Sequence, residues 1–346
     1  MSSNSSLENS QTKDFKNEIL EMLSQLQKNE FALKQPFRAR AYGNAFKAIK
    51  AMDKPVYSVD DIKDLKGVGE KIQNKVQEYI TTGKLEKLEK VKDDPSLKAV
   101  KLFSDVMGIG PSKANNLVSK HKIFTIEELR EKRDDDGILN NKQKKGLDYY
   151  EDFIQRIPRK ELNKHNDFIK QEILKLIPNM TVEIVGSYRR GAKDSGDIDV
   201  LLTNNDEPSK VAEQFVKILD SMEEKKYLTY AFSRGNKKYL GVCKLPRHKY
   251  SRRIDIMYIP PEQYTFALMY FTGSGIFNVQ LRQQCIKLGL SLSEYGLKYT
   301  TGDKKGQFIE EKHTTEEQVF NYLGYKYIAP ENRVSGALEL EKNKLE

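Results

Sequence analysis

The chain is constrained most by one short stretch, which reads Gly-Ser-Tyr-Arg-Arg-Gly from Gly186 and Gly-Asp-Ile-Asp from Gly196. An apolar run at 182–185 comes directly before it and predicts a strand. A Gly-Ser turn that leaves a strand exposes backbone N–H groups and a hydroxyl to an anion. Because alternate residues of a strand share a face, we expect Asp197 and Asp199 to point together. Two carboxylates beside an anion cradle suit a triphosphate bridged by Mg²⁺.

An Asp-x-Asp pair alone is common at strand ends, but the whole segment is more specific. The Gly-Ser turn, the arginine pair and Gly-Asp-x-Asp before an apolar strand resemble the nucleotidyltransferase superfamily, and most closely the family X DNA polymerases of the beta type. That superfamily takes a third carboxylate from a neighbouring strand. Asp255 stands between Ile254 and Ile256 in an alternating apolar run and fits this position, whereas the alternative is a solvated edge residue.

The resemblance implies two-metal chemistry at the three carboxylates. Asp197 and Asp199 would bridge two Mg²⁺ ions, for which Mn²⁺ can substitute, and Asp255 would bind only the catalytic ion beside the primer 3′-hydroxyl. Its neighbour Arg253 is expected to favour the ionised form of Asp255, and it also matches a DNA-binding position.

The same resemblance implies a nucleotide site around these carboxylates. Five positions match those that hold the triphosphate: Gly186, Ser187, Arg190, Gly196 and Arg156. A second segment matches the one that presses on the sugar C2′ position through a cis Gly-Ser peptide: Tyr270, Phe271 and Gly273. Simple helix packing is the alternative for its two rings. Asn278 matches a further nucleotide contact, and Arg282 and Tyr295 match DNA contacts. Gly275 departs from the family, which has an aspartate over the incoming base in animal members.

Two Gly-x-Gly turns with an apolar middle residue come earlier in the chain, and each opens an amphipathic helix. They contain Gly67 with Gly69, and Gly108 with Gly110. Glycine allows the tight turn and lets backbone N–H groups approach a phosphate closely. One such turn is a weak signal, but the pair resembles the helix-hairpin-helix motifs with which family X enzymes grip both sides of a gap. The resemblance also implies a monovalent cation, Na⁺ or K⁺, at these turns.

The first helical region contains a cluster of basic residues. Lys75 falls where beta-type enzymes carry a lysine that forms a Schiff base with a 5′-deoxyribose phosphate. Neighbouring cations favour the neutral, nucleophilic form of a lysine. The alternative is that Lys75 is one of several phosphate-binding lysines on a solvated face. The DNA-binding positions implied around it are Arg38, Tyr42, Lys63, Lys71 and Lys87, with Lys84 in the same cluster. Asn74 and Phe37 depart from the family pattern.

Composition supports a polyanionic partner, since the net charge is +9, although a generally Lys-rich composition would give the same value. The two cysteines show no metal-ligand spacing and predict a reducing compartment. No apolar run approaches the roughly 20 residues of a membrane span. We expect an intracellular protein, either nuclear or, if the source is a large DNA virus, in the cytoplasmic viral factory or virion.

The expected fold class is multidomain α and β. A disordered tail (1–14) is followed by a helical lyase-like domain with the first hairpin (15–94) and a helical DNA-binding subdomain with the second (95–157). A nucleotidyltransferase-type α/β palm (158–260), an α+β nucleotide-selection subdomain (261–334) and a charged tail (335–346) complete the chain. No further domain is expected before the lyase-like region. The expected palm strands are 182–185, 198–203, 240–244 and 254–258, with a helix at 209–222 and another after the palm at 262–271.

The function these features predict is a template-directed DNA polymerase that fills short gaps in base excision repair and removes the 5′-sugar phosphate. It would act as a monomer on gapped or nicked double-stranded DNA and dNTP, with a repair ligase as a further partner. A template-independent nucleotidyltransferase and a non-catalytic gapped-DNA-binding protein are the alternatives. The paired hairpins and the Tyr-Phe-Thr-Gly segment oppose the first, and the three carboxylates oppose the second.

Overall fold

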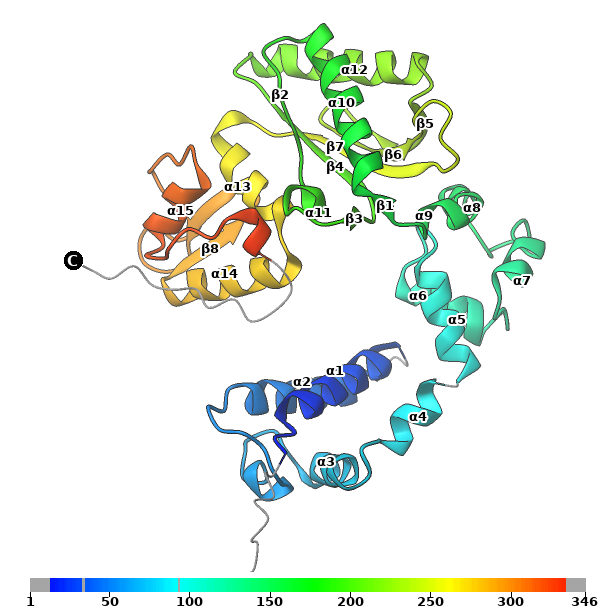
Figure 1. Cartoon of the computed structure of the whole chain (residues 1–346), viewed down its shortest axis with the longest axis vertical. Coiled ribbons are helices and arrows are strands. Elements are labelled where there is room, and N and C mark those ends of the chain that lie inside the picture. The colour runs from blue at the N-terminus through cyan, green and yellow to red at the C-terminus, as the bar shows by residue number, and fades with distance from the viewer. Residues whose placement is uncertain (1–12, 33–34, 93, 334–346) are drawn as a thin grey trace, which may run out of the picture. The chain divides into compact units, whose positions relative to one another are not determined.

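The computed structural model describes residues 13–32, 35–92 and 94–333, and the chain divides into two compact units, 1–148 and 149–346 (Figure 1). Each unit is described by itself. Apart from Lys13 and Asp14, the two tails expected from the sequence lie outside the described residues. No helix in the described ranges is long and apolar enough to cross a membrane.

The described part of the first unit is helical. Its first two helices pack through apolar side chains, because Ile19, Leu23 and Leu26 of α1 are fully buried with Ala45 and Ile49 of α2. Its helices are α1 (Lys16–Ala32), α2 (Pro36–Lys50), the 3₁₀ turn η1 (Val59–Asp61), α3 (Glu70–Thr82), α4 (Glu86–Lys92), α5 (Pro95–Ser104), α6 (Pro111–Ser119), α7 (Ile126–Glu131) and α8 (Asn141–Asp148).

A five-stranded mixed sheet is the centre of the second unit. Its spatial order is β2-β4-β7-β6-β5; β4 and β7 are parallel, and all other neighbours are antiparallel. The strands are β2 (Thr181–Ile184), β4 (Ile198–Thr203), β5 (Leu228–Arg234), β6 (Lys238–Cys243) and β7 (Arg252–Tyr258), with a short separate pair, β1 (Ile157–Pro158) and β3 (Asp194–Ser195). The short helix α9 (Tyr150–Phe153) precedes β1.

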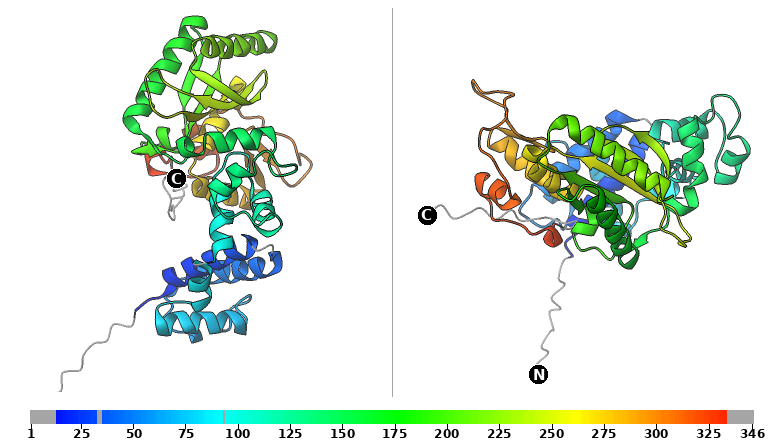
Figure 2. Two further views of the ribbon diagram at one scale, coloured as in Figure 1. Left: turned by 90° about the vertical axis from the view of Figure 1, so that its right-hand side faces the viewer. Right: turned by 90° about the horizontal axis from the view of Figure 1, so that it is seen from above.

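The two faces of this sheet are covered differently. On one face, α10 (Arg159–Leu176) and α12 (Pro208–Glu224) pack on Val200 and Ile256 in the main core, and Figure 2 shows both helices over the strands. On the other face, α13 (Pro261–Thr272) packs on Leu201 and Met257 in a much smaller core. Side chains alternate along a strand, so Asp199 shares the face of Leu201, and Asp255 that of Met257. Both carboxylates therefore lie on the sparsely covered face.

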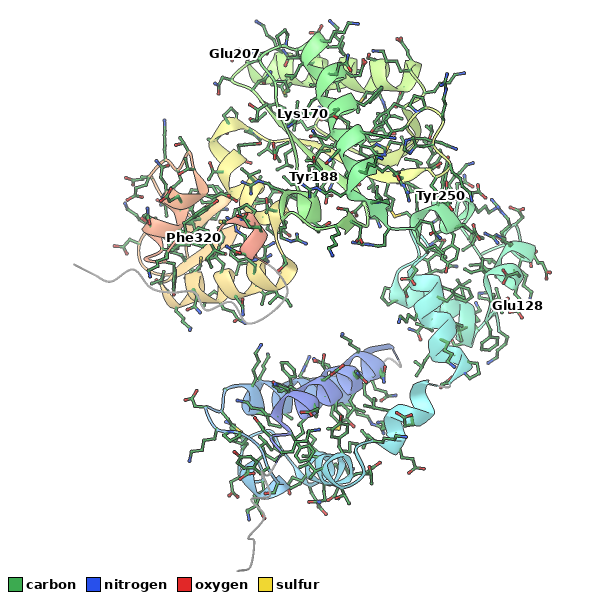
Figure 3. The ribbon with its side chains drawn as sticks, viewed as in Figure 1. Glu128, Lys170, Tyr188, Glu207, Tyr250 and Phe320 are labelled. Carbon is green, nitrogen blue, oxygen red and sulfur yellow. The ribbon has the colours of Figure 1, made fainter. Side chains whose placement is uncertain are left out.

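The C-terminal part of the second unit has its own core, which contains Phe320 (labelled in Figure 3) packed near Phe277. Its elements are α13, α14 (Gly275–Lys287), the hairpin β8 (Leu290–Ser293) and β9 (Gly296–Tyr299), α15 (Glu316–Tyr322) and the 3₁₀ turn η2 (Pro330–Asn332). The expected helices and strands are present with ends shifted by one to two residues. Strand β5 has no counterpart among the expected strands, because two register shifts break its alternation.

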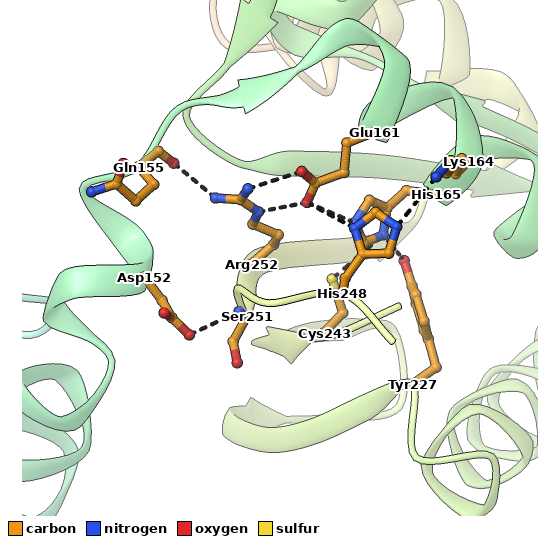
Figure 4. Close-up of polar contacts among 10 residues, drawn as sticks. All are labelled: Asp152, Gln155, Glu161, Lys164, His165, Tyr227, Cys243, His248, Ser251 and Arg252. Carbon is orange, nitrogen blue, oxygen red and sulfur yellow. Dashed lines mark hydrogen bonds and ion pairs between the residues drawn. The ribbon is translucent and has the colours of Figure 1, made fainter. Parts of the chain in front are cut away.

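A polar cluster anchors the start of β7 (Figure 4). Arg252, which is 3% exposed, donates to both carboxylate oxygens of Glu161 on α10 at 2.7 and 2.9 Å. Buried His165 lies on the other side of Glu161, at 3.7 Å. The Tyr227 hydroxyl is 2.7 Å from His165 Nδ1, so with Tyr227 as donor the ring presents Nε2–H to Glu161. Burial raises the pKa of Glu161, but the contacts with His165 and Arg252 outweigh it and lower that pKa to about 2.

This low pKa gives a test of the cluster. A carboxyl group whose pKa is lower in the folded than in the unfolded state stabilises the fold at pH values above its unfolded-state pKa. This stabilisation is lost as the pH falls through the folded-state pKa. Glu161→Gln should therefore cost about 3 kcal/mol at pH 6, and the pH-dependent part should vanish toward pH 2. Urea unfolding at several pH values measures this. The exposed pair of Asp220 and Arg234 provides the control, since Asp220→Asn should change stability by under about 1 kcal/mol. Equal losses in both variants would contradict the assignment.

Candidate active site

The carboxylates of Asp199 and Asp255 come together because β4 and β7 are parallel neighbours. The register pairs Asp199 directly with Asp255 and Ile198 with Ile254. The isoleucines are fully buried in the main core, which fixes the opposite direction for the two carboxylates. Asp197 precedes β4, so the strand itself carries only one carboxylate of the Asp-x-Asp pair.

Negative charge is concentrated at this pair. Burial, followed by the charges of Asp197 and Asp255, raises the pKa of Asp199 to about 7. Burial also raises the pKa of Asp255, and Arg253 only partly opposes this shift. Arg253 thus favours the ionised form of Asp255, as expected from the sequence, but burial has the larger effect on this pKa. Within the described residues, Asp255 Oδ1 is buried without a hydrogen-bond partner. The site is consequently short of positive charge.

The third carboxylate, that of Asp197, lies near enough to the pair to raise the pKa of Asp199, but it is also held by an arginine. Asp197 Oδ2 accepts a hydrogen bond from Arg253 Nη2 at 2.7 Å. No three His, Cys, Asp or Glu side chains of the described residues are close enough together to hold one metal ion. Two of the three expected ligands, Asp199 and Asp255, are therefore neighbours, while Asp197 is held by an arginine.

The expected anion turn is a single helical turn, α11 (Gly186–Arg189). Gly186 has φ of +62°, and a Cβ there would lie 2.8 Å from Asp199 Oδ2, so glycine permits the turn and the close approach to Asp199. Ser187 Oγ donates to Ser195 Oγ at 2.7 Å. Arg156 pairs with Asp194 at 2.6 Å and lies against Gly196, where a Cβ would be 3.1 Å from its guanidinium.

The two arginines of this turn reach into the C-terminal subdomain. Arg190 Nη1 donates to the carbonyl of Thr272 at 2.5 Å. Arg189 donates to the Thr272 hydroxyl at 2.8 Å and forms an ion pair with Glu316 at 2.9 Å. Glu316 also pairs with fully buried Arg333 at 2.8 Å. Glu316, at the start of α15, was not singled out by the sequence, because an acidic residue in a first helical turn is ordinary.

The segment after α13 brings most of the other expected nucleotide residues together. The Gly273–Ser274 peptide is cis, as the resemblance implies. The rings of Tyr270 and Phe271 meet edge to face at 5.0 Å. Asn278 donates to the Tyr270 carbonyl at 2.7 Å, and the Arg282 guanidinium lies 5.2 Å from the Tyr270 ring centre. Tyr295 is separate, since it lines a pocket of about 500 Å³ whose described lining lacks Tyr270 and Asn278.

The two Gly-x-Gly turns of the first unit have the same backbone. Gly67 and Gly108 have φ of +100° and +86°. Gly69 and Gly110 begin α3 and α6 with φ, ψ of −79°, 168° and −80°, 171°, and a Cβ on either would meet nothing within 4 Å. Both turns thus leave the start of their helix open to a ligand, as a helix-hairpin-helix requires.

The basic cluster around Lys75 contains a carboxylate that the sequence did not indicate. Lys75 Nζ donates to the Lys71 carbonyl at 2.9 Å. Lys87 forms an ion pair with Glu30 of α1 and lies 5.7 Å from the Tyr42 ring centre. Other members are less engaged: Arg38, Lys71 and Lys84 are exposed, and Lys63 pairs with Asp60 at 2.8 Å. Tyr42 is buried, so only part of its ring edge can reach a ligand.

The fold and the site define a nucleotidyltransferase palm joined to helix-hairpin-helix modules. Family models match in consecutive order: a helix-hairpin-helix domain (15–85), the fingers domain of DNA polymerase lambda (101–154), the DNA polymerase beta palm (156–261) and the DNA polymerase beta thumb (267–334). The chain belongs to the family X DNA polymerases. This confirms the predicted family and fold class.

Curated relatives agree with this assignment. DNA polymerase lambda of Arabidopsis thaliana is 32% identical over 335 residues, which cover 92% of this chain and 62% of that protein. DNA polymerase lambda of Rattus norvegicus is 34% identical over 332 residues, which cover 91% of this chain and 56% of that protein. The chain therefore spans somewhat over half the length of these relatives.

Gly186 gives a test of the site's geometry. Gly186→Ala places a methyl group 2.8 Å from Asp199 Oδ2, so the carboxylate must move. Nucleotide addition should fall at least about a hundredfold, since small misplacements of reacting groups are costly. Gly191→Ala is the matched control, because φ is also positive (+77°) but a Cβ meets nothing within 4 Å. Both variants should lose about 1 kcal/mol of stability. Similar primer-extension rates for the two would refute the close approach.

Proposed function

We propose that this chain is a template-directed DNA polymerase that fills short gaps and also removes a 5′-deoxyribose phosphate. The observation that carries the polymerase proposal is the register of Asp199 with Asp255 beside the Gly186 turn. The similarity to two DNA polymerase lambda proteins supports it. We propose gapped or nicked DNA and dNTP as substrates, a monomeric enzyme, and action in the nucleus or a viral factory with a repair ligase downstream.

The donor set fits divalent cations. Asp199 has a pKa raised to about 7 by burial and two neighbouring carboxylates, and Asp255 has an unpartnered buried oxygen, so both gain from a nearby positive charge. We propose that Asp197, once released from Arg253, joins them as a ligand of Mg²⁺ or Mn²⁺. Two such ions, when bound, stabilise the attacking and leaving oxygens of an in-line displacement.

The chain's own residues would orient the nucleotide. Ser187 and the Gly186 turn offer a hydroxyl and backbone N–H groups to the phosphates, and Arg190 offers the rest of its guanidinium while one nitrogen holds the Thr272 carbonyl. Tyr270, Phe271 and the cis Gly273–Ser274 turn would lie against the sugar, where they disfavour a ribose hydroxyl. Asn278 and Arg282 are placed on α14 to reach base edges.

The first unit would grip DNA and carry the second reaction. Both hairpins would bind backbone phosphates, with Na⁺ or K⁺ at their carbonyls. Neutral Lys75 would attack C1′ of the sugar aldehyde, and loss of water would give an imine. Removal of a C2′ proton then breaks the C3′–O bond, which frees the 5′-phosphorylated DNA end, and water hydrolyses the imine. Burial, then Lys87 and Lys71, lower the pKa of Lys75, which favours the amine.

Primer extension separates this proposal from its alternatives. A gapped duplex, a blunt duplex and a single strand are compared, each with dNTP and rNTP. Gap filling with dNTP that follows the template supports the proposal. Addition to the single strand would indicate a template-independent enzyme, and tight binding of gapped DNA without extension would indicate a binding protein.

Asp255 gives the test of the catalytic carboxylates. Asp255→Asn keeps the shape but removes the charge, so nucleotide addition should fall at least about a hundredfold. Gapped-DNA affinity should stay within about twofold, because Lys and Arg contacts to phosphates supply it. Extension and binding are measured on one duplex, with Asp220→Asn as the control. Extension within tenfold of wild type would overturn the role of Asp255.

Lys75 gives the test of the second reaction. Lys75→Ala cannot form an imine, so borohydride trapping on an incised abasic substrate should disappear while gap filling remains within about twofold. The carboxylates belong to the other unit, so their geometry should be unaffected. Lys84→Ala is the control from the same cluster. Equal trapping in wild type and Lys75→Ala would assign the imine to another lysine, with Lys71 the first candidate.

A further inference from the structure

Glu30 is a charged group buried in the first unit with half of its hydrogen-bonding capacity unused. The residue is 1% exposed. One carboxylate oxygen accepts from Lys87 Nζ, and the other has no hydrogen-bond partner among the residues that the structure describes. Burying a carboxylate is costly unless a strong interaction offsets the loss of water. Lys87, the partner of this carboxylate within the described part of the chain, is therefore held firmly.

Lys87 and Lys75, two lysines of the basic cluster, are in different environments. Lys87 on α4 contacts Glu30 on α1 and the Tyr42 ring on α2. Burial lowers the pKa of Lys87, but Glu30 and Tyr42 outweigh it and leave that pKa raised. Among the described residues, Lys75 on α3 has the Lys71 carbonyl as its hydrogen-bond acceptor and forms no ion pair with a carboxylate. The charges that face Lys75 are those of Lys87, Glu78, Lys71 and Glu30, and its pKa is lowered.

We propose that Glu30 is a positioning residue of this site, which holds the Lys87 ammonium in place until the 5′-phosphate of gapped DNA displaces the carboxylate. The inference rests on the proposed lyase function and adds a regulating group to it. Lys87, kept charged by Glu30, serves the phosphate and does not compete as nucleophile. Lys75, which has no carboxylate partner, is the lysine that can lose its proton. Glu30 thus separates the two roles and weakens phosphate binding in the process.

The test of displacement is the affinity for a one-nucleotide gap with a 5′-phosphate relative to the same gap with a 5′-hydroxyl. Glu30→Gln removes the competing charge but keeps an amide oxygen for Lys87. The preference for the 5′-phosphate should rise about three- to tenfold, since a freed ammonium binds phosphate more strongly. If Glu30 only stabilised the packing of α1 on α4, Glu30→Gln would make the cluster around Lys75 less ordered, and the preference for the 5′-phosphate would fall.

A matched control separates this role from a general charge effect. Glu78→Gln also removes a carboxylate that faces Lys75, but Glu78 accepts from the Glu86 backbone N–H, whereas the ion pair of Lys87 in the described residues is with Glu30. Both variants should move the midpoint of borohydride trapping to lower pH by about half a unit, because each carboxylate raises the pKa of Lys75. Only Glu30→Gln should change the 5′-phosphate preference; Glu78→Gln should stay within about twofold.

The outcomes keep the two proposals apart. If Glu30→Gln raised the 5′-phosphate preference but the wild type gave no borohydride trapping at any pH, the lyase proposal would be wrong. The proposal that Glu30 holds Lys87 would still be supported. The role of Glu30 would be overturned if Glu30→Gln showed normal borohydride trapping but an unchanged or lower preference for the 5′-phosphate. Glu30→Asp is the second variant if Glu30→Gln does not fold. Its shorter side chain keeps the charge, so it should raise the preference with a smaller shift of the trapping midpoint.

Discussion

The parallel pairing of β4 with β7 is the constraint on which the rest of the site depends. It places the carboxylates of Asp199 and Asp255 opposite each other, with fully buried isoleucines fixing their direction. Burial and the repulsion between like charges oppose full ionisation of such a pair when no cation is near. For this reason the pKa of Asp199 is raised to about 7. The fold offsets only part of the charge, through Arg253 and Lys238. A palm of this kind is thus built to gain stability when positive charge arrives.

Several cationic positions of the site already have an anionic partner within the protein. Arg253 pairs with Asp197, Arg156 with Asp194, and Lys87 with Glu30. In the proposed function, these pairs would hold the side chains in position before a substrate binds, which would lower the entropy lost when they bind a phosphate. A phosphate would then have to displace a carboxylate of the protein. Binding would favour ligands with high local charge.

Sequence alone could predict the parts of the site that follow from local pattern. The alternating pattern predicted the strands of Asp199 and Asp255, and the family resemblance implied that they are neighbours, as observed. The Gly-x-Gly turns predicted two helix starts, which are observed with one backbone conformation. The partners of the basic residues could not be predicted in this way. Glu30, Glu161 and Glu316 lie on helices where an acidic residue is usually solvated, and only tertiary packing buries them against Lys87, Arg252 and Arg333.

The ion pairs of these three glutamates, of which Glu30 and Glu316 are buried and Glu161 is partly buried, share two features. Each lies far along the chain from the cation it binds and joins separate elements: α1 to α4, α10 to β7, and α15 to the segment that follows η2. A buried ion pair adds little net stability, but breaking one is costly, so it restricts the ways in which elements can pack. Glu316 extends this to Arg189, which binds the residue just before the cis Gly273–Ser274 turn. The α11 turn and the cis Gly273–Ser274 turn are therefore linked through Arg189 to one buried carboxylate, that of Glu316.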